Sequence, residues 1–129
     1  MPTPRPVQLT TPAQRSSVRL ARLVAAGVAA DVGLTVDDTE DLRVAVTELV
    51  ALLVEGAPDP QADIEVTFRG APGQVVVEGR RSAAGPGGDG AAVDDLALEL
   101  LRVMVDEHSF TADGDGRRFH LVKRARTTV

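Results

Sequence analysis

Glu48 lies near the middle of a strongly apolar helix pattern, where a carboxylate can act as a general base or help to hold a cation. The pattern runs from Val36 to Gly56, and its apolar residues recur every three or four positions, which predicts an α-helix with one buried face. The apolar residues are Leu42, Ala45, Val46, Leu49, Val50 and Leu53. The chain also offers a more ordinary interpretation of Glu48, as a solvent-facing acid paired with Arg43 or with a nearby basic helix.

A second helix pattern, beginning at Ser16 or Ser17 and ending at Gly33, carries three arginines along one side. Arg15, Arg19 and Arg22 are three or four residues apart, so they share one face of the helix. Two interpretations follow from this spacing. The face can be solvated and paired with nearby acids, or it can be a surface that binds an acidic partner.

Composition excludes several classes of function. Nineteen acidic residues against fourteen basic ones give a net charge of -5, and three Phe are the only aromatic residues apart from two His, so we expect no nucleic-acid partner. There is no cysteine for thiol chemistry or disulfides, and neither His108 nor His120 belongs to a metal-ligand spacing, so we expect no metal site. Without an apolar run of signal or membrane-spanning length, we expect a cytoplasmic protein that does not bind membranes.

The remaining segments predict strands and one further helix. We expect an extended N-terminal segment over 1–15 with a short edge strand at Val7 to Leu9, one domain over 16–124, and a frayed tail over 125–129. The expected elements after the central helix are a hairpin of Asp63 to Arg69 and Val75 to Glu78, a mobile Gly-rich loop from Arg80 to Gly90, a helix from Asp94 to His108, and a hairpin of Ser109 to Thr111 and Arg118 to Val122. This order indicates an α+β fold, a two-layer sandwich in which helices pack on one face of an antiparallel sheet.

The order of elements and three segments resemble a known family. With TELVALLVEG on the second helix, VVVEG before a Gly-rich loop and LLRVMVDEHSF before the last hairpin, the chain from Ser16 to Arg124 resembles the anti-sigma-factor and serine-protein-kinase branch of the GHKL (Bergerat-fold) ATPases. The resemblance implies that the first helix, with its Ala21-Arg22 pair, lies near a surface that binds a sigma factor or a small antagonist protein. It also implies three boxes for ATP and magnesium.

In these three boxes only one residue of this chain matches a functional residue of the family. In the first box Glu48 matches the general base, but Leu52 stands where the family has the magnesium-binding Asn. In the second, a D-x-G-x-G run that binds adenine, the positions are Gly79, Arg81 and Ala83. In the phosphate-binding third box they are Asp95 and Ala97. Because Leu cannot coordinate magnesium and a carboxylate repels phosphate, we expect ATP binding to be lost.

Three hypotheses follow. The first is a regulatory binding protein that sequesters a sigma factor or antagonist through Arg15, Arg19 and Arg22, with no cofactor and with a possible homodimer through the first helix. The second is an active ATP-dependent protein serine kinase with Glu48 as its base, which requires magnesium-dependent ATP binding despite Leu52, Gly79 and Asp95. A different register of the second box, with the glycines at 85, 87, 88 and 90 and Asp89 supplying a displaced nucleotide contact, is a separate alternative. The third is a module for an unrelated small ligand.

Overall fold

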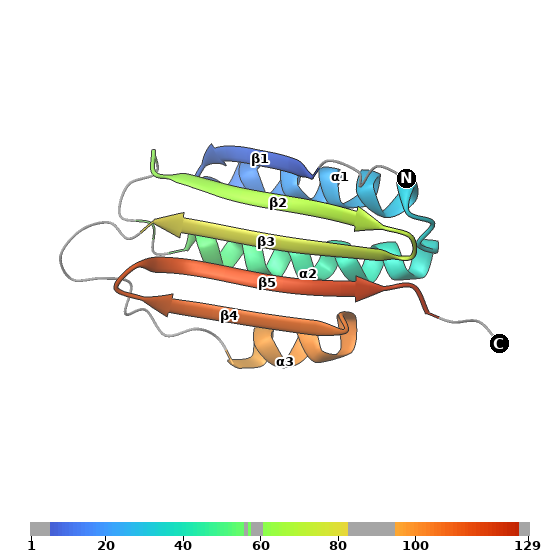
Figure 1. Ribbon diagram of the computed structural model, residues 1–129. Helices are drawn as coiled ribbons and strands as arrows, with labels where there is room; N and C mark the ends of the chain where they lie inside the picture. Colours follow the sequence, from blue (N-terminus) through green and yellow to red (C-terminus); the bar gives the residue numbers. More distant parts are fainter. Residues whose placement is uncertain (1–5, 56, 58–60, 83–94, 127–129) are drawn as a thin grey trace.

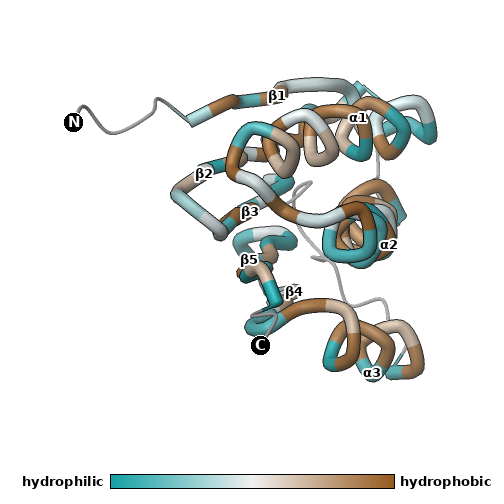
Figure 2. Tube along the Cα trace, turned by 90° about the vertical axis from the view of Figure 1, so that its right-hand side faces the viewer, coloured by the Kyte–Doolittle hydropathy of each residue, from teal (hydrophilic) through white to brown (hydrophobic). Residues whose placement is uncertain are grey.

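In the part of the chain that the structure describes, five antiparallel strands form one sheet and three helices cover one of its faces (Figures 1 and 2). The computed structural model describes residues 6–55, 57, 61–82 and 95–126. The elements are β1 (Val7–Pro12), α1 (Arg15–Asp31), α2 (Val36–Val54), β2 (Asp63–Ala71), β3 (Gln74–Ser82), α3 (Asp95–Met104), β4 (Glu107–Asp113) and β5 (Gly116–Arg124). The strand order is β1-β2-β3-β5-β4. The predicted two-layer α+β fold is therefore confirmed.

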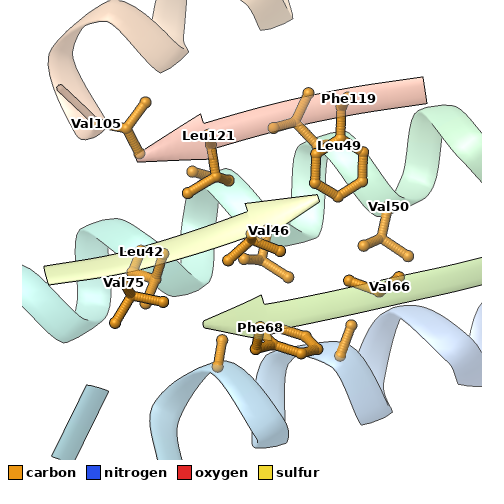
Figure 3. Close-up of a cluster of buried hydrophobic side chains, with 14 of the residues drawn as sticks. Leu42, Val46, Leu49, Val50, Val66, Phe68, Val75, Val105, Phe119 and Leu121 are labelled. Atoms are coloured by element: carbon orange, nitrogen blue, oxygen red, sulfur yellow. The ribbon is translucent and has the colours of Figure 1, made fainter. Parts of the chain in front are cut away.

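Helix α2 lies at the centre of the helical layer and supplies much of the core. Its six predicted apolar residues have no exposed surface, and they pack against the sheet beside Val66, Phe68 and Leu121 (Figure 3). The helix begins as predicted, because the Thr35 hydroxyl accepts a hydrogen bond from the Asp38 N–H at 3.1 Å. It ends at Val54, and the predicted stop at Gly56 lies outside the described residues.

Helix α1 packs against α2 through small side chains. Ser17, Ala21, Ala25 and Ala29 recur every fourth residue and are buried, so the two helices can approach closely. The predicted serine cap is wrong: α1 begins at Arg15, and the preceding residue makes no side-chain capping bond. The Ser17 hydroxyl instead donates to the Pro12 carbonyl and ties α1 to β1. None of the described helices is long and apolar enough to cross a bilayer.

Strands β1 and β3 are longer than the sequence indicated. The expected edge strand at Val7 to Leu9 is present as β1 and continues to Pro12, where it pairs with β2. Strand β3 continues to Ser82, so the mobile loop expected from Arg80 is wrong for its first three residues. The reason is the pairing with β5, in which each residue from Gln74 to Ser82 has a partner. The remainder of that expected loop lies outside the described residues.

Helix α3 is shorter than expected. It ends at Met104, whereas Glu107 and His108, expected in the helix, belong to β4. The Asp106 N–H donates to the Val122 carbonyl of β5 at 2.9 Å, which draws the chain out of the helix and into the sheet. The predicted turn between the last two strands is formed, with Gly116 at a φ of 121° and the Asp115 N–H bound to the Asp113 carboxylate at 2.8 Å.

A buried ion cluster fixes the amino end of α2 to the end of β5. The Asp38 side chain is fully buried and lies 3.7 Å from the Lys123 ammonium, whose side chain is 4% exposed. The same ammonium lies 3.6 Å from Asp41 and donates to the Met104 carbonyl at 3.0 Å. Arg126 adds a backbone N–H at 3.1 Å from Asp38. Three elements and the chain after β5 therefore meet at one set of charges.

Candidate functional site

The carboxyl end of α2 is held by two arginines that extend from neighbouring strands. Arg81 of β3, 1% exposed, donates from Nη1 to the Leu53 carbonyl and, at 2.9 Å, to the Glu55 carbonyl. Arg117 of β5, 2% exposed, donates from Nη1 to the Leu52 carbonyl at 2.6 Å. The last carbonyls of a helix lack partners within the helix, and cations there interact favourably with the helix dipole. Both guanidinium groups therefore cap α2.

A phenylalanine ring covers the position at which the resembled family has its adenine-binding aspartate. Gly79 of β3 is directly opposite Phe119 of β5 and faces the helical layer. A Cβ added to Gly79 would lie 2.7 Å from Cζ and 2.9 Å from Cδ2 of Phe119, closer than side chains tolerate. Phe119 is 4% exposed and extends from β5 into the core cluster (Figure 3). No side chain larger than hydrogen fits at residue 79 unless the ring moves.

The first box of the family contributes a carboxylate and a buried leucine. Glu48 is half-buried on α2, and within the described residues it makes no hydrogen bond or ion pair. The pairing with Arg43 that we considered is absent, because Arg43 binds Glu40 at 2.7 Å. Leu52, one turn further on, is 5% exposed and belongs to the core. Glu48 is therefore a carboxylate that could bind magnesium, but residue 52 supplies no second oxygen ligand for the ion.

The third box falls on the first turn of α3, and its two residues point in different directions. Asp95 is the exposed first residue of the helix, where a carboxylate is favoured by the helix dipole. Ala97 is 8% exposed and packs inward. The second-box residue Ala83 lies outside the described residues, as does the expected Gly-rich cluster at 85–90.

A hollow of about 420 Å³ lies on the opposite, helix-free face of the sheet. Polar residues of all five strands line it, among them Glu78 and His120, which are directly opposite each other on β3 and β5. Arg80 and Arg118 also line it, but each is bound to an acid, Glu65 at 2.6 Å and Asp113 at 3.3 Å. The hollow is therefore a polar, solvated face of an antiparallel sheet, separated from the α2 arginines by the sheet itself.

The three arginines of α1 lie together at the surface, as their spacing predicted. Arg15 and Arg19 are exposed, and Arg22 is half-buried with an Nε atom that has no hydrogen-bond partner. Within the described residues none of the three forms an ion pair or a hydrogen bond. Two exposed apolar side chains, Leu20 at 44% and Leu23 at 63%, lie on one side of them on the same helix. The face is thus basic with an apolar margin.

Comparison with known proteins identifies the class to which this architecture belongs. Residues 11–123 match the family described as the histidine kinase-like ATPase domain, so the chain belongs to that family. The fold is also similar to part of a crystal structure of the RsbU and RsbW domains of a Mycobacterium tuberculosis protein, with a TM-score of 0.69, 19% identity and coverage of 98% of this chain and 35% of that one.

Two curated relatives place the similarity more specifically, because both are serine-protein kinases named RsbW. The chain is 34% identical over 65 residues to the serine-protein kinase RsbW of Halalkalibacterium halodurans, a match that covers 50% of this chain and 40% of the relative. It is 36% identical over 63 residues to RsbW of Bacillus subtilis, covering 49% of this chain and 39% of the relative. The matches thus span about two-fifths of the length of these relatives. The resemblance to the anti-sigma-factor and serine-protein-kinase branch, first seen in the sequence, is confirmed.

Sequence reasoning missed Arg117 altogether and placed Arg81 in a loop. The available signal was the alternation of β3, in which Val75, Val77 and Gly79 face the helices, because the next residue in that series is Arg81. An arginine at such a position contradicts the usual rule that charges stay outside, and the Leu53 and Glu55 carbonyl oxygens at the end of α2 help to make it favourable.

Proposed function

We propose that this chain is an anti-sigma-like regulatory binding protein that sequesters an acidic protein partner through the basic face of α1, defined by Arg15, Arg19 and Arg22. One observation carries the proposal. Every other lysine or arginine in the described part of the chain, apart from Arg69, is bound to an acid or to a carbonyl oxygen. In a protein of net charge -5, three neighbouring cations without partners among the described residues are a surface available to an acidic protein.

The chemistry of the α1 face and the similarity to known proteins favour one class of partner. Arginine binds carboxylates through paired N–H donors, and Leu20 and Leu23 offer apolar contact at one margin. A sigma factor or a small antagonist protein with an acidic, partly apolar surface fits this description, and the similarity to RsbW supports the choice. A second copy of the chain, bound through α1, is the other arrangement consistent with the exposed leucines.

We also propose that the chain does not bind ATP. Three features support this: Phe119 fills the space at Gly79, Leu52 offers no oxygen to magnesium, and Arg81 and Arg117 occupy the end of α2. Loss of one hydrogen bond to a charged group costs about 1.5–3 kcal/mol, or roughly ten- to a hundredfold in affinity. The combined loss leaves no affinity in the usual range for a nucleotide.

A second candidate, an ATP-dependent protein serine kinase, is favoured by Glu48. This carboxylate is half-buried, has no partner among the described residues and stands at the position of the family's general base. Isothermal titration calorimetry with ATP and magnesium distinguishes the two candidates, since a kinase requires micromolar to low millimolar affinity.

The binding proposal is tested by charge reversal on α1. The chain with Arg19→Glu and Arg22→Glu is used to capture proteins from native lysate, alongside the parent chain and a control with Arg69→Glu. The control reverses an exposed arginine on β2 that has no partner among the described residues. We expect the parent and the control to retain a sigma factor or antagonist identified by mass spectrometry, and the α1 variant to lose it. Equal capture by all three chains would exclude the α1 face.

A further inference from the structure

Two consecutive arginines on β3 lie directly opposite two consecutive arginines on β5, close to the end of α2. Arg80 is directly opposite Arg118, and Arg81 is directly opposite Arg117. Like charges in directly opposed positions on a sheet repel, so each pair needs compensation. On the helix-free face, exposed Arg80 and Arg118 bind Glu65 and Asp113. On the helical face the two buried guanidinium groups bind carbonyl oxygens of α2.

The contacts of the two buried arginines connect the sheet to α2, on which α1 packs. Arg81 and Arg117 each reach more than 25 residues back along the chain to the last turn of α2, at Leu52, Leu53 and Glu55. Helix α1 in turn packs mainly on α2, with further contacts to β1, β2 and β3, so a displacement of α2 is transmitted to α1 in part. The amino end of α2 is fixed separately by the Asp38–Lys123 cluster. Both ends of the helix are thereby tied to the sheet by charged groups of the chain itself.

We propose that Arg81 and Arg117 are positioning residues that hold α2, and with it the basic face of α1, in place without a bound nucleotide, so that partner binding by this chain is constitutive. The inference rests on the proposed function, and it adds how the recognition surface is maintained. A bound nucleotide would connect elements of the fold only while it is present, whereas Arg81 and Arg117 contact the α2 carbonyls as part of the chain itself.

The matched arginines allow a close control. Amide hydrogen exchange is measured by mass spectrometry on the full chain with Arg81→Met or Arg117→Met, and on chains with Arg80→Met or Arg118→Met, which remove the neighbouring arginine from the other face of the sheet. We expect exchange in the last turn of α2 to quicken at least tenfold in the first two variants, with a smaller rise in α1, and to stay unchanged in the controls. Equal exchange in all four variants would overturn the inference, as would an α1 that does not respond.

Two further measurements keep the test decisive. If the Met variants do not fold, Arg117→Lys retains the charge but cannot reproduce the guanidinium geometry, and faster exchange at the end of α2 with a smaller rise in α1 is again expected. Exchange of the parent chain is also measured with 1 mM ATP and magnesium, where we expect no change. Slower exchange in α2 with nucleotide would contradict constitutive positioning. Failure of the α1 charge reversal to affect capture would refute the binding proposal alone, because the exchange measurements do not depend on a partner.

Discussion

Gly79 and Phe119 are directly opposed across β3 and β5, and the phenylalanine ring lies over the glycine so closely that a single added carbon would collide with it. The relationship explains why a glycine stands within a long central strand, where it is normally unfavourable. It also means that the ring and the glycine must change together if the space near residue 79 is ever to receive a side chain or a ligand.

Replacing Gly79 with Ala should destabilise the fold by about 1–3 kcal/mol, because the Phe119 ring must move within a packed core. Urea denaturation measures the change in the free energy of unfolding. In a double-mutant cycle with Phe119→Ala, the two effects should be less than additive, since the smaller side chain leaves room for the new methyl group. Strict additivity would show that the ring does not restrict residue 79.

Replacing Leu52 with Asn, the residue of the resembled family, should lower the free energy of unfolding by about 2–4 kcal/mol and should not create magnesium binding. Leu52 is 5% exposed and belongs to the core, so the change removes apolar contacts and buries an amide. Glu48→Gln on the same helix is the control and should have little effect. A stable Asn variant that bound magnesium would show that the site is only one substitution away from function.

Replacing Lys123 with Met should cost about 3 kcal/mol in the free energy of unfolding, because Asp38 would keep a buried charge and lose its nearest buried cation. Arg124→Met is the matched control on the adjacent residue. Arg124 pairs with Glu107 at the surface, where both side chains are about half exposed, so the control should cost less than about 1 kcal/mol. Chemical denaturation of both variants at neutral pH compares them.

The stability of the fold should fall as acid protonates Asp38. Burial raises the pKa of the Asp38 carboxyl, but the Arg126 backbone N–H, the Thr35 hydroxyl and the charges of Lys123 and Arg126 together lower the pKa below its usual value of 3.8. The unfolded chain then takes up a proton before the folded chain does. This contribution is present above pH 3.8 and is lost as the pH falls through the pKa of the folded state.

Thermal unfolding between pH 7 and pH 2.5 checks the expected loss. In the parent chain the midpoint should drop more steeply below pH 3.8 than in the Asp38→Asn variant, which starts from a lower stability and lacks the titrating group. Parallel curves for the two proteins would mean that other carboxylates cause the acid sensitivity.

The helical layer and the sheet were predictable because they follow from the periodicity of apolar residues. The buried arginines at the end of α2 were not predictable in this way. The α2 stripe from Leu42 to Leu53 and the alternation of β2 report directly which residues face the core. The ends of β3 and α3 depended instead on pairing with β5, a contact distant in sequence. The buried arginines were hidden for the same reason, since Arg81 acquires its partners only when β3 lies beside the end of α2.

The central claim is that this member of a nucleotide-binding family performs recognition without nucleotide. Isothermal titration calorimetry of the full chain with ATP, in the presence and absence of magnesium, tests the claim most directly. The account predicts no measurable heat of binding at nucleotide concentrations up to about 1 mM, a limit that corresponds to roughly -4 kcal/mol. Saturable, magnesium-dependent binding in the micromolar range that Glu48→Ala weakened would contradict it.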